Sequence, residues 1–173
     1  GGVGLILCQW ANALGATVIG TVSTEEKAEL SRAHGCHHPV VYTRQDFVAE
    51  VDRITGGAKL PVVYDSVGKD TFAKSLDCLR PRGLMVSFGN ASGPPDPIAP
   101  GVLSQKGSLF LTRPTLYHYV AAREELEQSA NDLFEIVASG KVKIEIGRRF
   151  ALKDAAEAHR ALGARRTTGS TIF

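Results

Sequence analysis

The sequence lacks a long hydrophobic run, an excess of one charge and a closely spaced cysteine pair. No apolar segment approaches the roughly 20 residues of a membrane-spanning helix, so we expect no membrane association. The 20 basic residues nearly balance the 18 acidic ones, for a net charge of +2, which does not favour nucleic acid as a partner. The 173 residues, 43% hydrophobic and 22% charged, are typical of a soluble globular protein.

The three cysteines, Cys8, Cys36 and Cys78, are widely spaced. Without a C-x-x-C pair they predict neither a structural zinc site nor a disulfide framework. We expect Cys8, on the apolar face of the first helix, to be a buried free thiol, and a reducing cytoplasm to be the compartment. Three histidines flank Cys36 within residues 34–38. Four donors so close together at a helix-to-strand turn cannot all face inward, so we expect no metal there.

Helical and strand patterns alternate along the first two thirds of the chain. Helices are expected at 4–14, 24–34, 46–55 and 69–79, strands at 17–22, 39–42, 60–66, 84–89 and 107–114, and a loop at 90–101. This alternation predicts an α/β fold, a Rossmann-type doubly wound parallel sheet flanked by helices.

The rhythm changes after residue 112. A long helix at 118–139, an alternating strand at 141–146, a helix at 152–162 and a last strand at 169–173 are expected there. We therefore predict a nucleotide-binding domain over 1–115 and a separate α+β return segment over 116–173.

The chain begins with Gly1-Gly2-Val3-Gly4, directly before the first amphipathic helix. Gly2 and Gly4 carry no Cβ, so a pyrophosphate could approach their backbone, and a helix N-terminus favours phosphate. A lone Gly-x-Gly is weak evidence, but its place before a helix and a buried strand indicates a dinucleotide site. The strand that normally leads into such a loop is expected to be missing from this chain.

No acidic residue stands at the end of the second strand, where an NAD site usually carries one for the ribose 2′-hydroxyl. Ser23 follows that strand, Lys27 comes one helical turn later, and Tyr42 and Arg44 follow the next strand. A missing carboxylate beside a cation favours a 2′-phosphate, hence NADPH over NADH. The alternative for Lys27 is an ordinary exposed lysine. The neighbouring residues 25 and 26, both glutamates, are expected to face solvent in the first helical turn.

Two further strands end in small polar turns. Residues 65–68, Asp-Ser-Val-Gly, and 88–90, Phe-Gly-Asn, lie at the carboxyl ends of strands, where ligands bind in this fold. A ribose and a nicotinamide are expected there. The alternative is a plain strand-to-helix turn in which Asp65 is a structural cap.

Five segments together resemble the zinc-independent quinone oxidoreductases of the medium-chain dehydrogenase/reductase superfamily, and the zeta-crystallin-like NADPH:quinone reductases most of all. They are GGVGLILCQWANALGA, GTVSTEEKA, VVYDSVG, RGLMVSFGNASG and QKGSLFLTRP. Members of that family are about twice as long, with a GroES-like substrate domain before the nucleotide-binding domain. The resemblance implies that this chain is the C-terminal half, and that its tail belongs with the GroES-like domain it lacks.

The resemblance also implies which residues contact the cofactor. Gly2, Val3 and Gly4 match the loop over the pyrophosphate, and Ser23, Lys27 and Tyr42 match the surroundings of the 2′-phosphate. Ser66 and Val67 match the turn near the adenosine ribose, and Phe88, Gly89, Asn90 and Arg113 match the nicotinamide side. Arg165 matches a basic residue near the cofactor.

The implied activity is hydride transfer from NADPH to a quinone. The cofactor carries this chemistry, and no catalytic residue or metal ligand is assigned. Two alternatives stay open: reduction of an enal or enoyl thioester by the same superfamily, and a non-catalytic nucleotide-binding module. A short-chain dehydrogenase is excluded because no tyrosine has a lysine four residues later, and a zinc alcohol dehydrogenase because its four-cysteine lobe is absent.

Residues 107–113 are expected to be the last strand of the sheet, long and apolar. An unprotected edge of this kind invites pairing, and the family typically pairs it across a two-fold axis, so we expect a homodimer. The alternative is an edge covered by the 118–139 helix.

Overall fold

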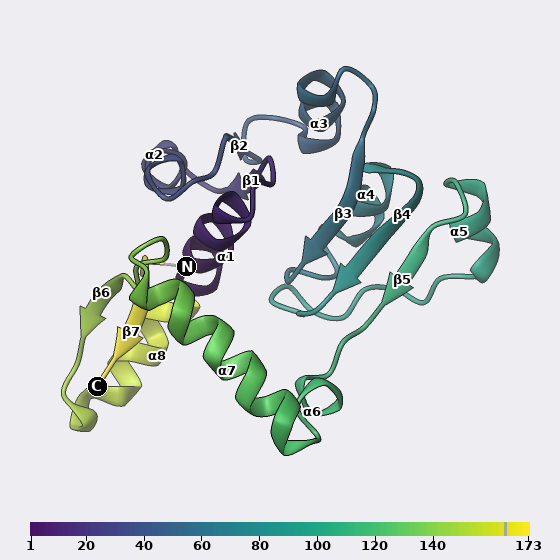
Figure 1. Ribbon diagram of the computed structural model, residues 1–173. Helices are drawn as coiled ribbons and strands as arrows, with labels where there is room; N and C mark the ends of the chain where they lie inside the picture. The colour runs from purple at the N-terminus through teal and green to yellow at the C-terminus, as the bar shows by residue number, and fades with distance from the viewer. Residues whose placement is uncertain (165) are drawn as a thin grey trace. The chain divides into compact units, whose positions relative to one another are not determined.

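The computed structural model describes residues 1–164 and 166–173 (Figure 1). The chain divides into two compact units. The terminal unit combines Gly1–Thr43 with Gln128–Phe173, and the central unit is Arg44–Glu127. Every paired strand in the described residues is parallel to its neighbour, and the predicted α/β class is confirmed. The predicted domain boundary at residue 115 does not coincide with the bounds of these units, and it stays a prediction.

The central unit is a three-stranded parallel sheet with short helices. The order of its strands is β3-β4-β5, and Val62 stands opposite Leu84 while Leu84 stands opposite Phe110. The strands are β3 (Leu60–Asp65), β4 (Leu79–Ser87) and β5 (Phe110–Thr112), and the helices are α3 (Phe47–Thr55), α4 (Phe72–Asp77), α5 (Pro100–Gln105) and α6 (Leu116–Tyr119).

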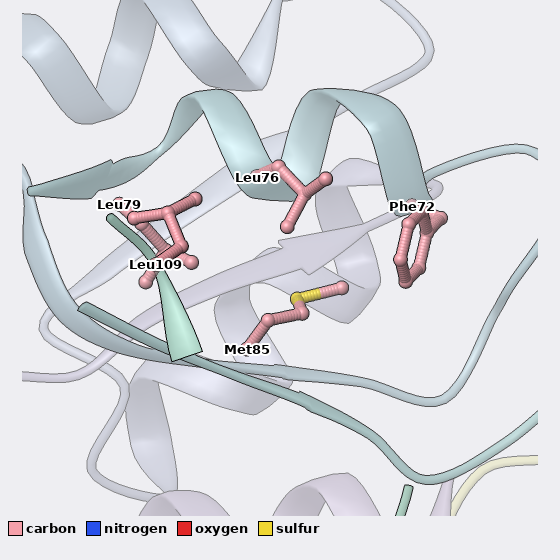
Figure 2. Packing of buried hydrophobic residues seen from close by; sticks show 5 residues of the cluster. All are labelled: Phe72, Leu76, Leu79, Met85 and Leu109. Atoms are coloured by element: carbon pink, nitrogen blue, oxygen red, sulfur yellow. The ribbon is translucent and has the colours of Figure 1, made fainter. Parts of the chain in front are cut away.

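The core of the central unit lies between α4 and this sheet (Figure 2). Phe72 and Leu76 point from α4 toward Met85 of β4, and Leu79 and Leu109 close one side. Met85 is wholly inaccessible to solvent. Burying a side chain of this size contributes about 1.5–3 kcal/mol to the free energy of folding. This cluster therefore stabilises the position of β4 in the sheet.

The terminal unit contains both ends of the chain. In it β1 pairs with β2, and β6 pairs with β7. Its elements are α1 (Gly2–Ala13), β1 (Ile19–Val22), α2 (Glu25–Ala33), β2 (His38–Val41), β6 (Ile146–Arg149), a 3₁₀ turn η1 (Leu152–Asp154), α8 (Ala155–Gly163) and β7 (Ser170–Ile172), while α7 (Arg123–Ala138) begins in the central unit and ends here. The β1-β2 and β3-β4-β5 pairings match the 3-2 and 4-5-6 neighbours of a Rossmann sheet.

The strand predicted at 141–146 is wrong. Residues 141–145 form no ladder, and a side chain rather than a strand pairs with the backbone of Lys143 in the middle of this segment. Gln9 of α1 donates from Nε2 to the carbonyl of Lys143 at 3.0 Å, and the N–H of Lys143 donates to Gln9 Oε1 at 2.9 Å. Pairing starts only at Ile146, which stands opposite Ser170.

The single helix predicted at 118–139 is also wrong, because the chain forms two helices there, α6 and α7. Val120 has φ −132° and ψ 27°, which is outside the helical range and interrupts the helix. The carboxylate of Glu125 accepts from the N–H of Ala122 at 3.4 Å. A glutamate at the third helical position that reaches back in this way starts a new helix.

The other corrections concern length. β4 begins at Leu79 rather than 84, because the chain continues the sheet through Pro81 and Gly83, and α4 is correspondingly shorter than predicted. β5 covers three residues instead of the long strand predicted at 107–114. A helix, α5, follows the loop and has Pro100 at its start. No helix among the described residues has both the length and the apolarity to cross a bilayer.

Candidate functional site

The glycine motif forms the first turn of α1 rather than a loop before it. The helix begins at Gly2, with Gly1 as its N-cap, two residues before the predicted start. A Cβ on Gly4 would meet nothing within 4 Å, whereas a Cβ on Gly2 would lie 2.7 Å from Ser170 Oγ. Gly4 and the exposed Val3 therefore leave room for a ligand. Gly2 is needed for close packing against β7, which the sequence did not reveal.

Ser23, Lys27 and Tyr42 lie together at the carboxyl ends of β1 and β2. Ser23 follows β1, and the ammonium group of Lys27 donates to Ser23 Oγ at 3.2 Å. Tyr42 follows β2, and its N–H donates to the carbonyl of Val22 at 3.1 Å. This end of the β1-β2 pair thus presents a cation and a hydroxyl, and no carboxylate stands at the tip of β1.

The two glutamates of α2 lie where they were expected. Glu25 and Glu26 are exposed in the first helical turn, where negative charge suits the positive end of the helix. Thr24 is the N-cap, and its Oγ1 accepts from the N–H of Lys27 at 3.3 Å. The cap fixes the start of α2 and with it the place of the lysine.

Asp65, at the end of β3, is a structural cap, as the alternative interpretation had it. Its side chain is buried and its carboxylate accepts four hydrogen bonds. Oδ1 accepts from the N–H groups of Val67 and Gly68 at 2.8 and 3.0 Å. Oδ2 accepts from the hydroxyls of Thr71 and Ser75 at 2.7 and 2.8 Å. The carboxylate therefore ties the turn after β3 to α4, and has no acceptor capacity facing outward.

The turns after β3 and β4 are held against each other by their backbones. The N–H of Ala91 donates to the carbonyl of Ser66 at 3.1 Å, and the N–H of Ser92 donates to the carbonyl of Val67 at 2.8 Å. A Cβ on Gly89 would lie 2.4 Å from the carbonyl oxygen of Ser66. Only glycine allows this approach, so Gly89 sets the distance between the two turns.

Arg113, which follows β5, contacts the end of β4. Its guanidinium donates to the carbonyl of Ser87 at 2.8 Å. Phe88 packs edge-on against Tyr64, with 6.4 Å between ring centroids. The structure thus gathers Ser66, Val67, Phe88, Gly89, Asn90 and Arg113 at the carboxyl edge of one sheet.

The predicted site residues therefore fall into two groups, one in each unit; apart from Gly2, Val3 and Gly4 in the first turn of α1, they follow the carboxyl ends of parallel strands. One group, in the terminal unit, comprises Gly2, Val3, Gly4, Ser23, Lys27 and Tyr42, and the other, in the central unit, comprises the six residues just described. Arg165 lies outside the described residues. The assignment of all thirteen to cofactor binding stays a prediction.

Cys8 and Cys36 are neighbours in the terminal unit. A hydrogen bond from the Cys8 thiol lowers the pKa of Cys36 to about 7, and the same bond, with burial, raises the pKa of Cys8 above its usual range. Cys36 is buried, whereas Cys8 is only partly buried, contrary to expectation. Burial raises the pKa of Cys78 to about 11. All three cysteines are free thiols.

The histidines near Cys36 are used within the fold. His34 Nδ1 lies 2.7 Å from the carbonyl of Leu30, and its Nε2 lies 3.2 Å from a carboxylate oxygen of Glu145. His37 Nδ1 accepts from the N–H of Val18 at 3.0 Å. Within residues 1–164 and 166–173, no three His, Cys, Asp or Glu side chains are placed to hold a metal ion.

The chain is similar to known proteins in sequence and in fold. The chain is 56% identical over 173 residues to a quinone oxidoreductase of Pseudomonas aeruginosa, covering 100% of this chain and 53% of the relative. It is 52% identical to a 2-haloacrylate reductase of Burkholderia sp., covering 100% of this chain and 52% of the relative. The solved structure of Escherichia coli quinone oxidoreductase complexed with NADPH superposes with a TM-score of 0.96 at 50% identity, covering 100% of this chain and 54% of that one.

The chain thus spans about half the length of the curated relatives it matches. Residues 2–135 match the zinc-binding dehydrogenase family. The resemblance to the quinone oxidoreductases of the medium-chain superfamily, predicted from the five segments, is confirmed. The chain belongs to the zinc-binding dehydrogenase family.

Proposed function

We propose that this chain is the cofactor-binding part of an NADPH-dependent quinone oxidoreductase. The observation that carries the proposal is the end of β1, where Lys27 Nζ donates to Ser23 Oγ at 3.2 Å and the residue that follows the strand is a serine rather than an acidic residue. A cation there favours a 2′-phosphate over a ribose hydroxyl. The relatives named quinone oxidoreductase support the choice of acceptor.

Each unit, taken by itself, contains residues that suit one part of NADPH. Lys27, Ser23 and Tyr42 would hold the adenosine end, and the uncovered backbone at Gly4 would accept the pyrophosphate. The turns at Ser66–Val67 and Phe88–Asn90, with Arg113, would hold the ribose and nicotinamide. When bound, NADPH supplies the hydride. These residues bind and orient it, and we assign none of them a proton-transfer role.

Lys27→Glu tests the cofactor assignment. If Lys27 contacts the 2′-phosphate, the change should weaken NADPH binding by about 1.5–3 kcal/mol, or roughly 10- to 150-fold, and leave NADH almost unchanged. Lys153→Glu, at an exposed lysine of η1 in the same unit, is the matched control for the charge change. The assignment is wrong if both cofactors weaken equally, or if the control behaves as Lys27→Glu does.

Reduction of an activated alkene is the second candidate, and the 52% identity to a 2-haloacrylate reductase favours it. Consumption of NADPH by the complete protein, measured with 1,4-benzoquinone and with 2-chloroacrylate, separates the two. Turnover of the quinone alone supports the first proposal, and turnover of the alkene alone overturns it. Binding of NADPH without turnover of either would indicate the non-catalytic nucleotide-binding module.

We further propose a homodimer formed through β5, the edge strand of the central sheet. Its exposed residues support this: Phe110 is 61% exposed and Leu111 39% exposed. Unprotected apolar edges pair readily. Light scattering should give a dimer mass for the wild type and a monomer mass for Phe110→Asp, and a wild-type monomer would refute the proposal.

Zinc independence, a cytoplasmic location and a domain boundary near residue 115 complete the proposal. Zinc independence is supported by the hydrogen bonds that already engage His34 and His37. Metal analysis of the purified complete protein tests it, and one equivalent of zinc retained after dialysis would contradict it.

A further inference from the structure

Two cysteine side chains from different elements meet inside the terminal unit. Cys8 lies on α1, and Cys36 lies on the short connection between α2 and β2. Their thiols are hydrogen-bonded to each other. The two residues are far apart in the sequence and share no motif, so only the fold brings the two sulfur atoms together.

The packing of α1 on this connection explains why the sulfurs are close. Gly35 has a φ of +85°, and a Cβ there would lie 3.0 Å from the Cβ of Asn12, one helical turn after Cys8. The N–H of Cys36 donates to the carbonyl of Ser31 at 3.0 Å, which fixes the connection on the end of α2. Since α1 approaches the residue directly before Cys36, the preceding turn of the helix places Cys8 beside it.

The Cys36 side chain also packs against β1 and the residue before it. Its sulfur lies 3.8 Å from the carbonyl oxygen of Val18, and a Cβ on Gly20 would lie 3.0 Å from that sulfur. Cys36 is 1% exposed, whereas Cys8 is partly exposed. The pair therefore consists of one sulfur that solvent reaches and one buried sulfur that the surrounding backbone holds in place.

The hydrogen bond makes a thiolate available near neutral pH. The bond from Cys8 is the largest cause of the lowered pKa of Cys36, about 7; burial opposes it, and hydrogen bonds from the Ser31 hydroxyl and the backbone of His38 act in the same direction as Cys8. The thiolate, not the thiol, is the nucleophile toward an oxidant. Because the remaining proton is shared between the two sulfurs, the negative charge belongs to the pair.

We propose that Cys8 and Cys36 form a redox-modification site, at which hydrogen peroxide converts the two thiols reversibly into a disulfide. The Cys8 sulfur, as the thiolate, attacks one oxygen of the peroxide. The O–O bond breaks, hydroxide leaves, and Cys8 becomes a sulfenic acid. The hydroxide takes the proton that Cys36 holds, and the Cys36 sulfur attacks Cys8 Sγ, so that the S–S bond forms and the S–O bond breaks. The two sulfurs together lose two electrons, and the peroxide is reduced to one water and one hydroxide ion.

The disulfide would join α1 covalently to the residues that lead into β2. An S–S bond is about 2.05 Å long, shorter than any thiol hydrogen bond, so α1 and this connection must draw closer together. The helix concerned is the one that begins with the glycine motif. In a reducing compartment such a bond is transient, which suits a reversible modification. The site does not depend on the proposed function.

Peptide mapping of the complete protein by mass spectrometry tests the site. After treatment with hydrogen peroxide at about pH 8, the peptides that contain Cys8 and Cys36 should be joined, and dithiothreitol should separate them. Cys78 is the internal control, because burial raises its pKa to about 11 and it should stay a free thiol. Cys78→Ser should leave the linkage unchanged, whereas Cys8→Ser and Cys36→Ser should abolish it. If peroxide leaves Cys8 and Cys36 unlinked, or links them to Cys78 as readily as to each other, the proposal is wrong.

The melting temperature shows whether the disulfide forms within the native fold. A disulfide that the fold accommodates stabilises it, so oxidation should raise the melting temperature of the wild type by about 2–8 °C, and dithiothreitol should reverse the rise. Cys36→Ser should show no rise, and Cys8→Ser, at the partly exposed position, makes the same comparison if the buried substitution prevents folding. A linked protein that melts at a lower temperature would mean that the bond forms only from the opened chain, and would overturn the proposal.

Discussion

Replacing Asp65 with alanine should strongly destabilise the central unit. The side chain is 4% exposed, and its carboxylate accepts from Val67 N, Gly68 N, Thr71 Oγ1 and Ser75 Oγ at 2.7–3.0 Å. Alanine removes all four acceptor contacts at once. The two hydroxyls can turn to other acceptors, but the two backbone N–H groups cannot.

The expected loss follows from those contacts. A hydrogen bond to a charged group contributes about 1.5–3 kcal/mol, and a buried donor without an acceptor costs about 1–3 kcal/mol. Because such losses are not additive, we expect about 3–5 kcal/mol in the free energy of unfolding for Asp65→Ala. For a chain of this size the melting temperature should fall by about 10 °C.

Two further variants make the test specific. Asp65→Asn keeps an oxygen for the two N–H groups and offers an amide N–H₂ to the two hydroxyls, so we expect a loss of about 1–2 kcal/mol. Asp70→Ala, at an exposed aspartate five residues along the same segment, should change stability by less than about 0.5 kcal/mol. Urea unfolding followed by circular dichroism measures all three. Equal stability of Asp65→Ala and Asp70→Ala would refute the capping role.

Two other predictions concern the terminal unit. Gln9→Leu should cost about 1–3 kcal/mol, measured by urea unfolding, because it removes two part-buried hydrogen bonds to the N–H and carbonyl of Lys143, each of which contributes about 0.5–1.5 kcal/mol. A loss confined to Gln9→Ala and absent from Gln9→Leu would indicate packing instead. The pKa of Cys36 is lowered to about 7 in the folded protein, from 9.0 ordinarily. Between these two pH values the unfolded chain therefore binds more protons than the folded one. The free energy of unfolding should rise from pH 7 to pH 9, and this gain should be lost as pH falls through 7. Cys8→Ala removes the thiol that donates to Cys36, and should flatten this rise in the urea midpoint; an unchanged rise would contradict the assigned cause.

Local patterns were good predictors where neighbours in sequence decide the structure. The helix at α3 follows from its apolar spacing, its cap Asp46 and the left-handed Gly56 that ends it, all within eleven residues of sequence. The strand β3 follows from its β-branched run. The placement of Lys27 one turn into α2 also follows from local signals, because Thr24 caps that helix.

Prediction failed where a distant residue supplies the partner. Residues 141–146 alternate like a strand. The N–H and carbonyl of Lys143, which a neighbouring strand would otherwise bond, are instead hydrogen-bonded to the side chain of Gln9, 134 positions away. The break between α6 and α7 is a different case, because its signals are local: the conformation of Val120 and the carboxylate of Glu125, which accepts from the N–H of Ala122 three residues earlier.

The sequence by itself determined the parallel α/β class, the family and the strand ends at which a cofactor would bind, because hydrophobic period, turn residues and the glycine motif are local properties of the chain. The tertiary structure decided which polar residues at those ends are engaged in the fold. It set Gly2 against Ser170 and bonded Gln9 to the backbone of Lys143. Contacts between residues more than a hundred positions apart leave no periodic trace in either segment, so only folding brings them into view.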